Sequence, residues 1–151
     1  MPTILLVDDE PEILAALSIV LEWRGYQVHR SGDAKAALEQ AGKGLPDLIV
    51  TDRNMPVMDG VQFCRQLKLY PALAATPVIM VSAHAPTHQE PALWSVLFFK
   101  PIDLGEFEST VGLLVLSRPM EETFQNPGIL SVLRIDTKIM MLRSGNGLAL
   151  S

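Results

Sequence analysis

Cysteine is almost absent from this chain of 151 residues, which carries Cys64 alone. A single thiol excludes an intramolecular disulfide framework and any multi-cysteine metal or iron–sulfur site, and it fits a reducing compartment. Charged residues are also scarce, at 19% against 48% hydrophobic residues. This composition argues against a disordered chain, and the length is that of one domain with a real core.

Basic residues are fewer than acidic ones: the chain has 12 Lys and Arg and 17 Asp and Glu, which gives a net charge of −5. That balance offers no broad basic surface, so we expect no nucleic-acid partner and no membrane partner. Residues 69–89 form the longest stretch without charge, but three prolines interrupt it, which excludes a membrane helix. The first apolar run leads into acidic residues, unlike a signal peptide, so we expect a cytoplasmic protein.

Apolar segments of two kinds alternate along the first 116 residues. Five short runs are typical of strands and four longer segments have helical spacing of apolar residues. The predicted strands are 3–7, 26–30, 47–51, 77–81 and 96–99, and the predicted helices are 11–24, 33–41, 61–70 and 103–116. Strands and helices in alternation favour an α/β fold with a doubly wound parallel sheet and helices on both faces.

Two segments depart from this alternation. Residues 82–95 contain Pro86 and Pro91, which leave room for a helix of at most a turn or two. The pattern is lost after residue 116, and residues 129–142 fit helix and strand templates about equally. We therefore expect one domain over residues 1–116 and an extension of unknown conformation over residues 117–151.

Polar side chains stand at the ends of four predicted strands. Asp8 and Asp9 end the first strand, Asp52 the third, Ser82 the fourth and Lys100 the fifth. Ligands of open parallel sheets bind outside the carboxyl ends of the strands, so these side chains should converge. Clustered carboxylates repel one another, which predicts a hard cation such as Mg²⁺ with an ammonium opposite. The alternative is that each acid caps the helix that follows it.

A carboxylate beside Mg²⁺ and a lysine has the parts of a phosphoryl acceptor, namely a nucleophilic oxygen and two cations for the phosphoryl oxygens. Asp52 would be the acceptor, and Ser82 could hydrogen-bond the new phosphoryl group. The alternative for Ser82 is a buried hydroxyl bonded to the backbone.

Over about residues 3–116 the chain resembles the receiver domain of two-component response regulators. The matching residues are the pair Asp8-Asp9 after an apolar strand, Asp52 in the segment 51–60 (TDRNMPVMDG), Ser82-Ala83, and Lys100-Pro101. The resemblance implies a (βα)5 flavodoxin-like sheet in the order 2-1-3-4-5. It also implies that Asp52 is phosphorylated by a histidine kinase or a phosphotransfer protein.

The same resemblance assigns roles to residues of the site. Asp9, Asp52 and the backbone carbonyl of Asn54 would ligate Mg²⁺, with Asp8 acting through water, while Lys100 and Ser82 would contact the phosphoryl group. The peptide bond before Pro101 is often cis in this family, as proline permits. Residues at modulating positions would be Arg53, Asn54, Ala83, His84, Leu97 and Pro101.

Two features differ from the usual receiver pattern. The family usually places Tyr or Phe three residues before the lysine, as a switch coupled to the Ser or Thr, and this chain has Leu97 there. The segment between Ser82 and Lys100 is also shorter than usual and broken by proline. Since the family builds its fourth helix there, we expect a shortened fourth helix and a different output surface.

Our main hypothesis is a stand-alone response regulator that controls a protein partner and is not an enzyme in its own right, with a homodimer as one possible assembly. A second hypothesis is a pseudo-receiver that keeps the fold but binds proteins without phosphorylation. A third is a Mg²⁺-dependent phosphohydrolase resembling the haloacid-dehalogenase group. That group needs a second Asp two residues after the nucleophile, where this chain has Asn54, so we expect negligible turnover of external phosphoesters.

Overall fold

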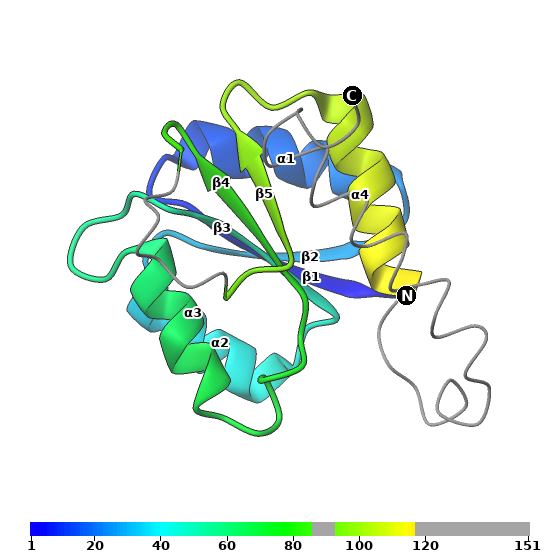
Figure 1. Cartoon of the computed structure of the whole chain (residues 1–151). Helices are drawn as coiled ribbons and strands as arrows, with labels where there is room; N and C mark the ends of the chain where they lie inside the picture. Colours follow the sequence, from blue (N-terminus) through cyan, green and yellow to red (C-terminus); the bar gives the residue numbers. More distant parts are fainter. Residues whose placement is uncertain (86–92, 117–151) are drawn as a thin grey trace, which may run out of the picture.

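Five strands and four helices alternate over residues 1–85 and 93–116, which are the residues described by the computed structural model (Figure 1). In chain order they are β1 (Thr3–Val7), α1 (Pro11–Trp23), β2 (Gln27–Ser31), α2 (Ala34–Gly44), β3 (Leu48–Asp52), α3 (Gly60–Lys68), β4 (Val78–Ser82), β5 (Val96–Phe99) and α4 (Leu104–Leu116). The predicted bounds of β1 and β5 are confirmed, and those of the other strands differ by one residue at their ends.

The strands form one parallel sheet in the order β2-β1-β3-β4-β5. This confirms the predicted doubly wound flavodoxin-like fold. The order of strands reverses direction beside β1, and ligands of such sheets bind at the carboxyl edge near this point. The carboxyl ends of β1, β3, β4 and β5 therefore decide where the site lies.

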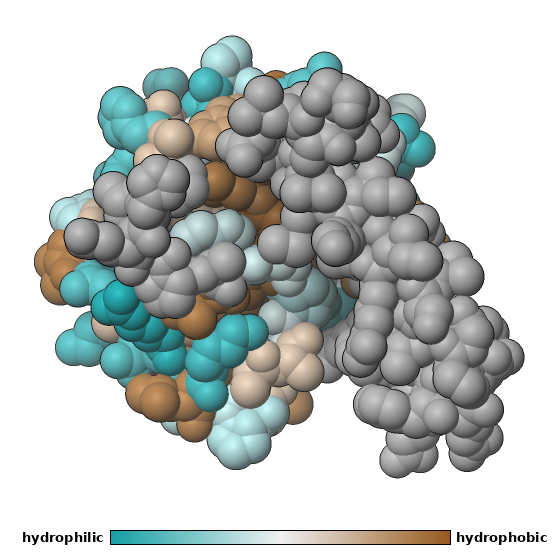
Figure 2. Space-filling model, viewed as in Figure 1, coloured by the Kyte–Doolittle hydropathy of each residue, from teal (hydrophilic) through white to brown (hydrophobic). Residues whose placement is uncertain are grey.

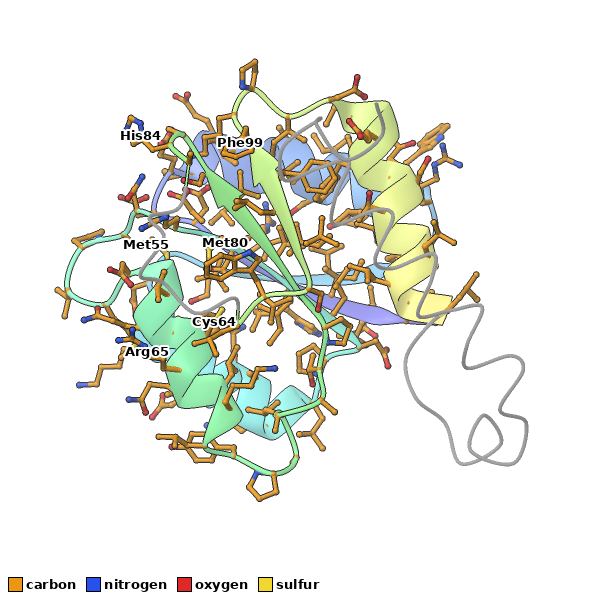
Figure 3. The ribbon with its side chains drawn as sticks, viewed as in Figure 1. Met55, Cys64, Arg65, Met80, His84 and Phe99 are labelled. Atoms are coloured by element: carbon orange, nitrogen blue, oxygen red, sulfur yellow. The ribbon has the colours of Figure 1, made fainter. Side chains whose placement is uncertain are left out.

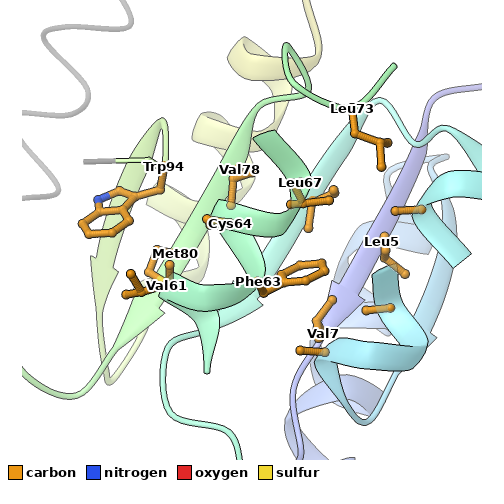
Figure 4. Packing of buried hydrophobic residues seen from close by; sticks show 14 of the residues in the cluster. Leu5, Val7, Val61, Phe63, Cys64, Leu67, Leu73, Val78, Met80 and Trp94 are labelled. Atoms are coloured by element: carbon orange, nitrogen blue, oxygen red, sulfur yellow. The ribbon is translucent and has the colours of Figure 1, made fainter. Parts of the chain in front are cut away.

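Side chains of the strands alternate between two apolar cores, one on each face of the sheet. Leu5 and Val7 of β1 pack with Phe63 and Leu67 of α3 on the face covered by α2 and α3 (Figure 4). Ile4 and its alternate neighbours pack on the opposite face, against α1 and α4. Burying one such aliphatic side chain contributes about 1.5–3 kcal/mol, so the two cores fix the sheet between the helices.

Helix ends follow local capping chemistry. Asp33 caps α2 by accepting a hydrogen bond from the amide of Ala36, and Asp59 forms a reciprocal capping box with Gln62 at the start of α3. The predicted end of the second helix at residue 41 is wrong. The helix continues through Gly44 and ends at Leu45, whose φ of 45° is left-handed.

Two large apolar side chains near helix ends are about half exposed. Tyr70 is 49% exposed because α3 ends at Lys68, before Tyr70 can join the buried face of the helix. Leu104, the first residue of α4, is 47% exposed, and the buried apolar residues of this helix begin at Phe107 and continue with Val111 and Leu114. Figure 2 shows hydrophilic and hydrophobic residues interspersed over the described part of one face.

Some sequence predictions lie outside the described residues. The shortened fourth helix falls mainly on residues 86–92, although residues 83–85 and 93–95 on either side of them are not helical. The extension of residues 117–151, and with it the division of the chain at residue 116, stays a prediction. No helix in the described ranges has the length and apolar character of a membrane span.

Candidate functional site

The carboxyl ends of the strands bring the predicted site residues to one edge of the sheet. Main-chain hydrogen bonds continue the strand pairing into the loops: the amide of Asp8 donates to Ser31, that of Arg53 to Val81, and that of Lys100 to Ser82. The distances are 3.1, 2.8 and 2.9 Å. These bonds hold the loops in register with the sheet, so that the first polar side chains after the strands have defined positions.

Asp52 and Lys100 form an ion pair at the centre of this edge. The Nζ of Lys100 lies 3.2 Å from Oδ1 of Asp52, and the Asp52 side chain is 3% exposed. Among the described residues, this Oδ1 is the buried side-chain polar atom without a hydrogen-bond partner. A carboxylate oxygen can accept more than one ligand, so beside the ammonium this buried oxygen keeps the capacity for a further one.

The environment of Lys100 favours its charged form. Burial acts to lower the pKa of this ammonium, but its contact with Asp52 and its attraction to Asp52, Asp8 and Glu10 outweigh burial, and the net pKa is raised. Lys100 is therefore a permanent cation at neutral pH. It can hold an anionic oxygen at the acceptor.

Asp8 lies beside Asp52 in a desolvated position. The pKa of Asp8 is raised from 3.8 to about 6. Burial is the largest cause and repulsion by Asp52 and Glu10 adds to it, while the hydrogen bond from the Glu10 amide and the attraction of Lys100 act to lower the pKa. That amide donates to Oδ1 of Asp8 at 2.9 Å. Asp8 and Asp52 also line one small cavity of about 10 Å³, which is room for about one water. A cation would relieve the repulsion between these two carboxylates.

Glu10 is a member of the site that sequence reasoning missed. Carboxylate oxygens of Asp8, Asp9 and Glu10 all lie within 4.8 Å of one another, and Oε1 of Glu10 lies 4.0 Å from Nζ of Lys100. The signal was its position directly after the Asp8-Asp9 pair, in the same loop.

The capping alternative for these acids is wrong. Glu10 occupies the N-cap position of α1, and no side chain caps that helix. The cap of α3 is Asp59, seven residues after Asp52, so Asp52 does not cap α3. Asp9 is exposed in the loop. The carboxylates of Asp9 and Asp52 are therefore not used as helix caps.

These residues fit a hard divalent cation. The unpartnered buried Oδ1 of Asp52 and the clustered oxygens of Asp8 and Asp9 are the ligand type that Mg²⁺ prefers. Asp52 is not part of the three-carboxylate cluster, so the predicted set of Asp9, Asp52 and the Asn54 carbonyl stays a prediction. Asn54 is exposed in the loop after β3.

The hydroxyl of Ser82 is engaged with its own loop. Its Oγ donates to the carbonyl of His84 at 2.7 Å and accepts from the His84 amide at 3.1 Å. This is the backbone-bonded arrangement that we had considered as the alternative for Ser82. A phosphoryl contact from Ser82 would require the hydroxyl to leave these bonds.

The loop after Asp52 is held close to the acceptor by Gly60. A Cβ on Gly60 would lie 2.5 Å from the carbonyl oxygen of Asp52 and 2.8 Å from the Sδ of Met80, so only glycine fits without a shift. At the tip of this loop Val57 is fully exposed with a φ of 71°, which is unusual for a β-branched residue.

The remaining predicted positions surround the acceptor at different depths. His84 and Phe99 lie together at the carboxyl ends of β4 and β5 (Figure 3), and His84 is exposed. Leu97 is buried in the core between the sheet and α3, at the position where the family usually has an aromatic residue. Ala83 and Pro101 are exposed, Arg53 is half-buried, and the Lys100–Pro101 bond is cis.

Relatives of this chain include transcriptional regulators. The alkaline phosphatase synthesis transcriptional regulatory protein PhoP of Bacillus subtilis is 40% identical over 80 residues, which is 53% of this chain and 32% of PhoP. The DNA-binding dual master transcriptional regulator RpaA of Synechocystis is 39% identical over 83 residues, which is 55% of this chain and 34% of RpaA. The chain thus spans about a third of the length of these two relatives.

The exclusion of a nucleic-acid partner is therefore wrong, because relatives that share this domain are DNA-binding regulators. The physical reason is that a net charge counted over this chain samples only about a third of such a protein. The charge of one domain says nothing about the surface of the rest.

A solved structure of another protein has the same fold as this chain. The chemotaxis protein CheY4 of Vibrio cholerae superposes with a TM-score of 0.71 at 30% identity, covering 76% of this chain and 98% of CheY4. Residues 4–108 match the family described as the response regulator receiver domain. This match extends over more than half of the chain and includes every strand of the sheet, so the chain belongs to the response regulator receiver domain family.

Proposed function

We propose that Asp52 accepts a phosphoryl group from a histidine kinase or a phosphotransfer protein, in a reaction that depends on Mg²⁺. The observation that carries the proposal is the buried carboxylate of Asp52, whose Oδ1 has the Lys100 ammonium 3.2 Å away, at the edge of the sheet where Asp8 also lies. A phosphoryl acceptor needs a nucleophilic oxygen with a cation beside it to hold the oxygens of the arriving group.

In the proposed reaction a carboxylate oxygen of Asp52 attacks phosphorus. A new O–P bond forms, and the bond to the donor breaks with its electron pair leaving on the donor. Lys100 moves from Oδ1 to an oxygen of the arriving group. Because the pKa of Lys100 is raised, its ammonium is charged at neutral pH and can hold that oxygen. Asp9, Asp52 and the Asn54 carbonyl would hold the cation, with Asp8 acting through water, and the cation would neutralise charge on the phosphoryl oxygens.

We assign modulating roles to residues around the acceptor. Exposed side chains there can meet the water that hydrolyses the acyl phosphate, and the buried Leu97 replaces an aromatic switch. These residues are Arg53, Asn54, Ala83, His84, Leu97 and Pro101. Ser82 would reach the phosphoryl group after leaving His84, and that exchange would move the ends of β4 and β5 toward a state that binds a partner.

The proposed role is regulatory, with chemistry confined to the domain's own phosphorylation and dephosphorylation. The action of the domain alone, a cytoplasmic location and the identity of the output partner stay predictions. The DNA-binding relatives make a transcriptional output a candidate for the whole protein.

Incubation with Mg²⁺ and acetyl phosphate tests this function. Intact-protein mass spectrometry should show one added phosphoryl group, and EDTA or Asp52→Asn should abolish it. Glu39→Gln, a charge removal on the exposed face of α2, is the control and should leave it unchanged. An unmodified wild-type protein, or an adduct that persists in Asp52→Asn, would contradict the proposal.

A pseudo-receiver is the second candidate, favoured by the two hydrogen bonds that hold the Ser82 hydroxyl to His84 and by the aliphatic Leu97. It predicts no phosphoryl adduct and no spectral response to beryllofluoride with Mg²⁺. The same experiment therefore separates the two functions.

A further inference from the structure

Glu10 stands on the open side of the acceptor site. Its side chain is 59% exposed, and its Oε1 lies 4.0 Å from the Lys100 ammonium, which itself lies 3.2 Å from Oδ1 of Asp52. Lys100 is thus placed between a buried carboxylate and an exposed one. Glu10 is therefore an exposed negative charge beside the ammonium that would hold an oxygen of an arriving phosphoryl group.

The formal charges around the acceptor are strongly negative. Within the part of the chain that the structure describes, four carboxylates, of Asp8, Asp9, Glu10 and Asp52, lie at this edge of the sheet, and the Lys100 ammonium pairs with two of them. A divalent cation would reduce this excess without reversing it. Glu10 shares its cluster with Asp8 and Asp9, and it is the member of that cluster that forms an ion pair with Lys100.

We propose that Glu10 is a specificity-determining residue that disfavours small dianionic phosphoryl donors at Asp52. This inference rests on the proposed function and extends it to the choice of donor. The negative field of Glu10 opposes the approach of a dianion more than that of a monoanion. A donor presented by a protein surface can offset this field with its own cations, and a free small molecule cannot.

Two small donors of different charge isolate the effect. Acetyl phosphate is a dianion near neutral pH, and its transfer to Asp52 releases acetate with the electron pair of the broken O–P bond. Phosphoramidate is a zwitterion with one net negative charge, and its transfer releases ammonia with the electron pair of the broken N–P bond. Removing one screened unit charge a few ångströms from a dianion should speed its reaction roughly threefold.

The experiment compares Glu10→Gln with Glu12→Gln, a matched charge removal two residues further along the chain in the first turn of α1. Phosphorylation rates are measured by quenched-flow mass spectrometry with each donor at saturating Mg²⁺. We expect Glu10→Gln to raise the rate about threefold with acetyl phosphate, to raise it less with phosphoramidate, and to lose this gain at about 1 M salt. Equal rates in the two variants, or equal gains with the two donors, would overturn the inference.

Two further measurements separate other roles. Calorimetric titration with Mg²⁺ should give affinities for Glu10→Gln and wild type that agree within about threefold. A loss of tenfold or more would make Glu10 a metal ligand and overturn the inference. If wild-type protein forms an adduct that Asp52→Asn lacks, the proposed function stands whatever Glu10 does, and only the absence of that adduct would overturn both.

Discussion

The backbone amide of Lys100 donates a 2.9 Å hydrogen bond to the backbone carbonyl of Ser82. This bond continues the pairing of β4 with β5 by one step beyond the last register pair, Ser82 with Phe99. The Lys100 ammonium pairs with Asp52 and the Ser82 hydroxyl pairs with His84. These two side chains therefore belong to residues whose backbones are hydrogen-bonded to each other. The acceptor and the surface near His84 are thus joined through one hydrogen-bonded pair of residues.

Gly60→Ala should disturb the acceptor through the backbone. An added methyl group would meet the carbonyl oxygen of Asp52 at 2.5 Å and the Cα of Arg53 at 2.9 Å. We expect the free energy of unfolding to fall by about 1–3 kcal/mol, measured by urea denaturation. Gly42→Ala in α2 is the control, since nothing lies within 4 Å of its added methyl group, and it should stabilise by about 0.5–1 kcal/mol.

Leu45→Gly should stabilise the protein. Leu45 ends α2 with a left-handed φ of 45°, which costs a residue with a Cβ about 1 kcal/mol relative to glycine. Leu69→Gly provides the comparison, because Leu69 ends α3 with a right-handed φ of −76° and gains nothing from glycine. Thermal unfolding should show a higher Tm for Leu45→Gly and a lower one for Leu69→Gly, and equal changes would argue against the left-handed cap.

Cys64 should be inert in the native protein. It is 1% exposed, and burial raises the pKa of its thiol to about 12, so almost no thiolate forms at pH 8. Ellman's reagent should label it only after denaturation in guanidinium, and Cys64→Ser should remove all labelling. Rapid labelling without denaturant would show that α3 opens readily.

Asp8→Asn should stabilise the metal-free protein at neutral pH. The pKa of Asp8 is raised to about 6, so the folded protein holds that proton more tightly than the unfolded chain does. Its contribution to stability is complete below about pH 3.8 and is lost as the pH rises through about 6. Urea denaturation in EDTA at pH 7.5 should show a gain of about 1–2 kcal/mol for Asp8→Asn and a smaller change for the exposed Asp9→Asn.

The affinity for Mg²⁺ should fall with acidity in a range that Asp8 sets. Because the pKa of Asp8 is about 6, protons compete with the cation at pH 5 but hardly at pH 7. Calorimetric titration should give an affinity about tenfold weaker at pH 5 than at pH 7. Asp8→Asn should bind more weakly at pH 7 and lose most of this dependence, and an unchanged pH profile would exclude Asp8 from the site.

Much of the fold could be predicted because the parallel strands are buried on both faces. Such strands are short apolar runs, and each ends where a polar residue enters the loop, as β1 ends before Asp8 and β5 before Lys100. Helix ends were less predictable, since the end of α2 depends on the backbone conformation of Leu45 and not on the glycines near it.

Local pattern determines which elements form in this protein and which polar residues follow them, because residue spacing and the burial of strands act over neighbouring positions. Packing in three dimensions determines the rest. It buries the Asp52 oxygen without a hydrogen-bond partner, bonds the Ser82 hydroxyl to His84, and places Glu10 beside Lys100. These placements depend on loop paths and side-chain rotamers, which form only when distant strands meet at one edge of the sheet.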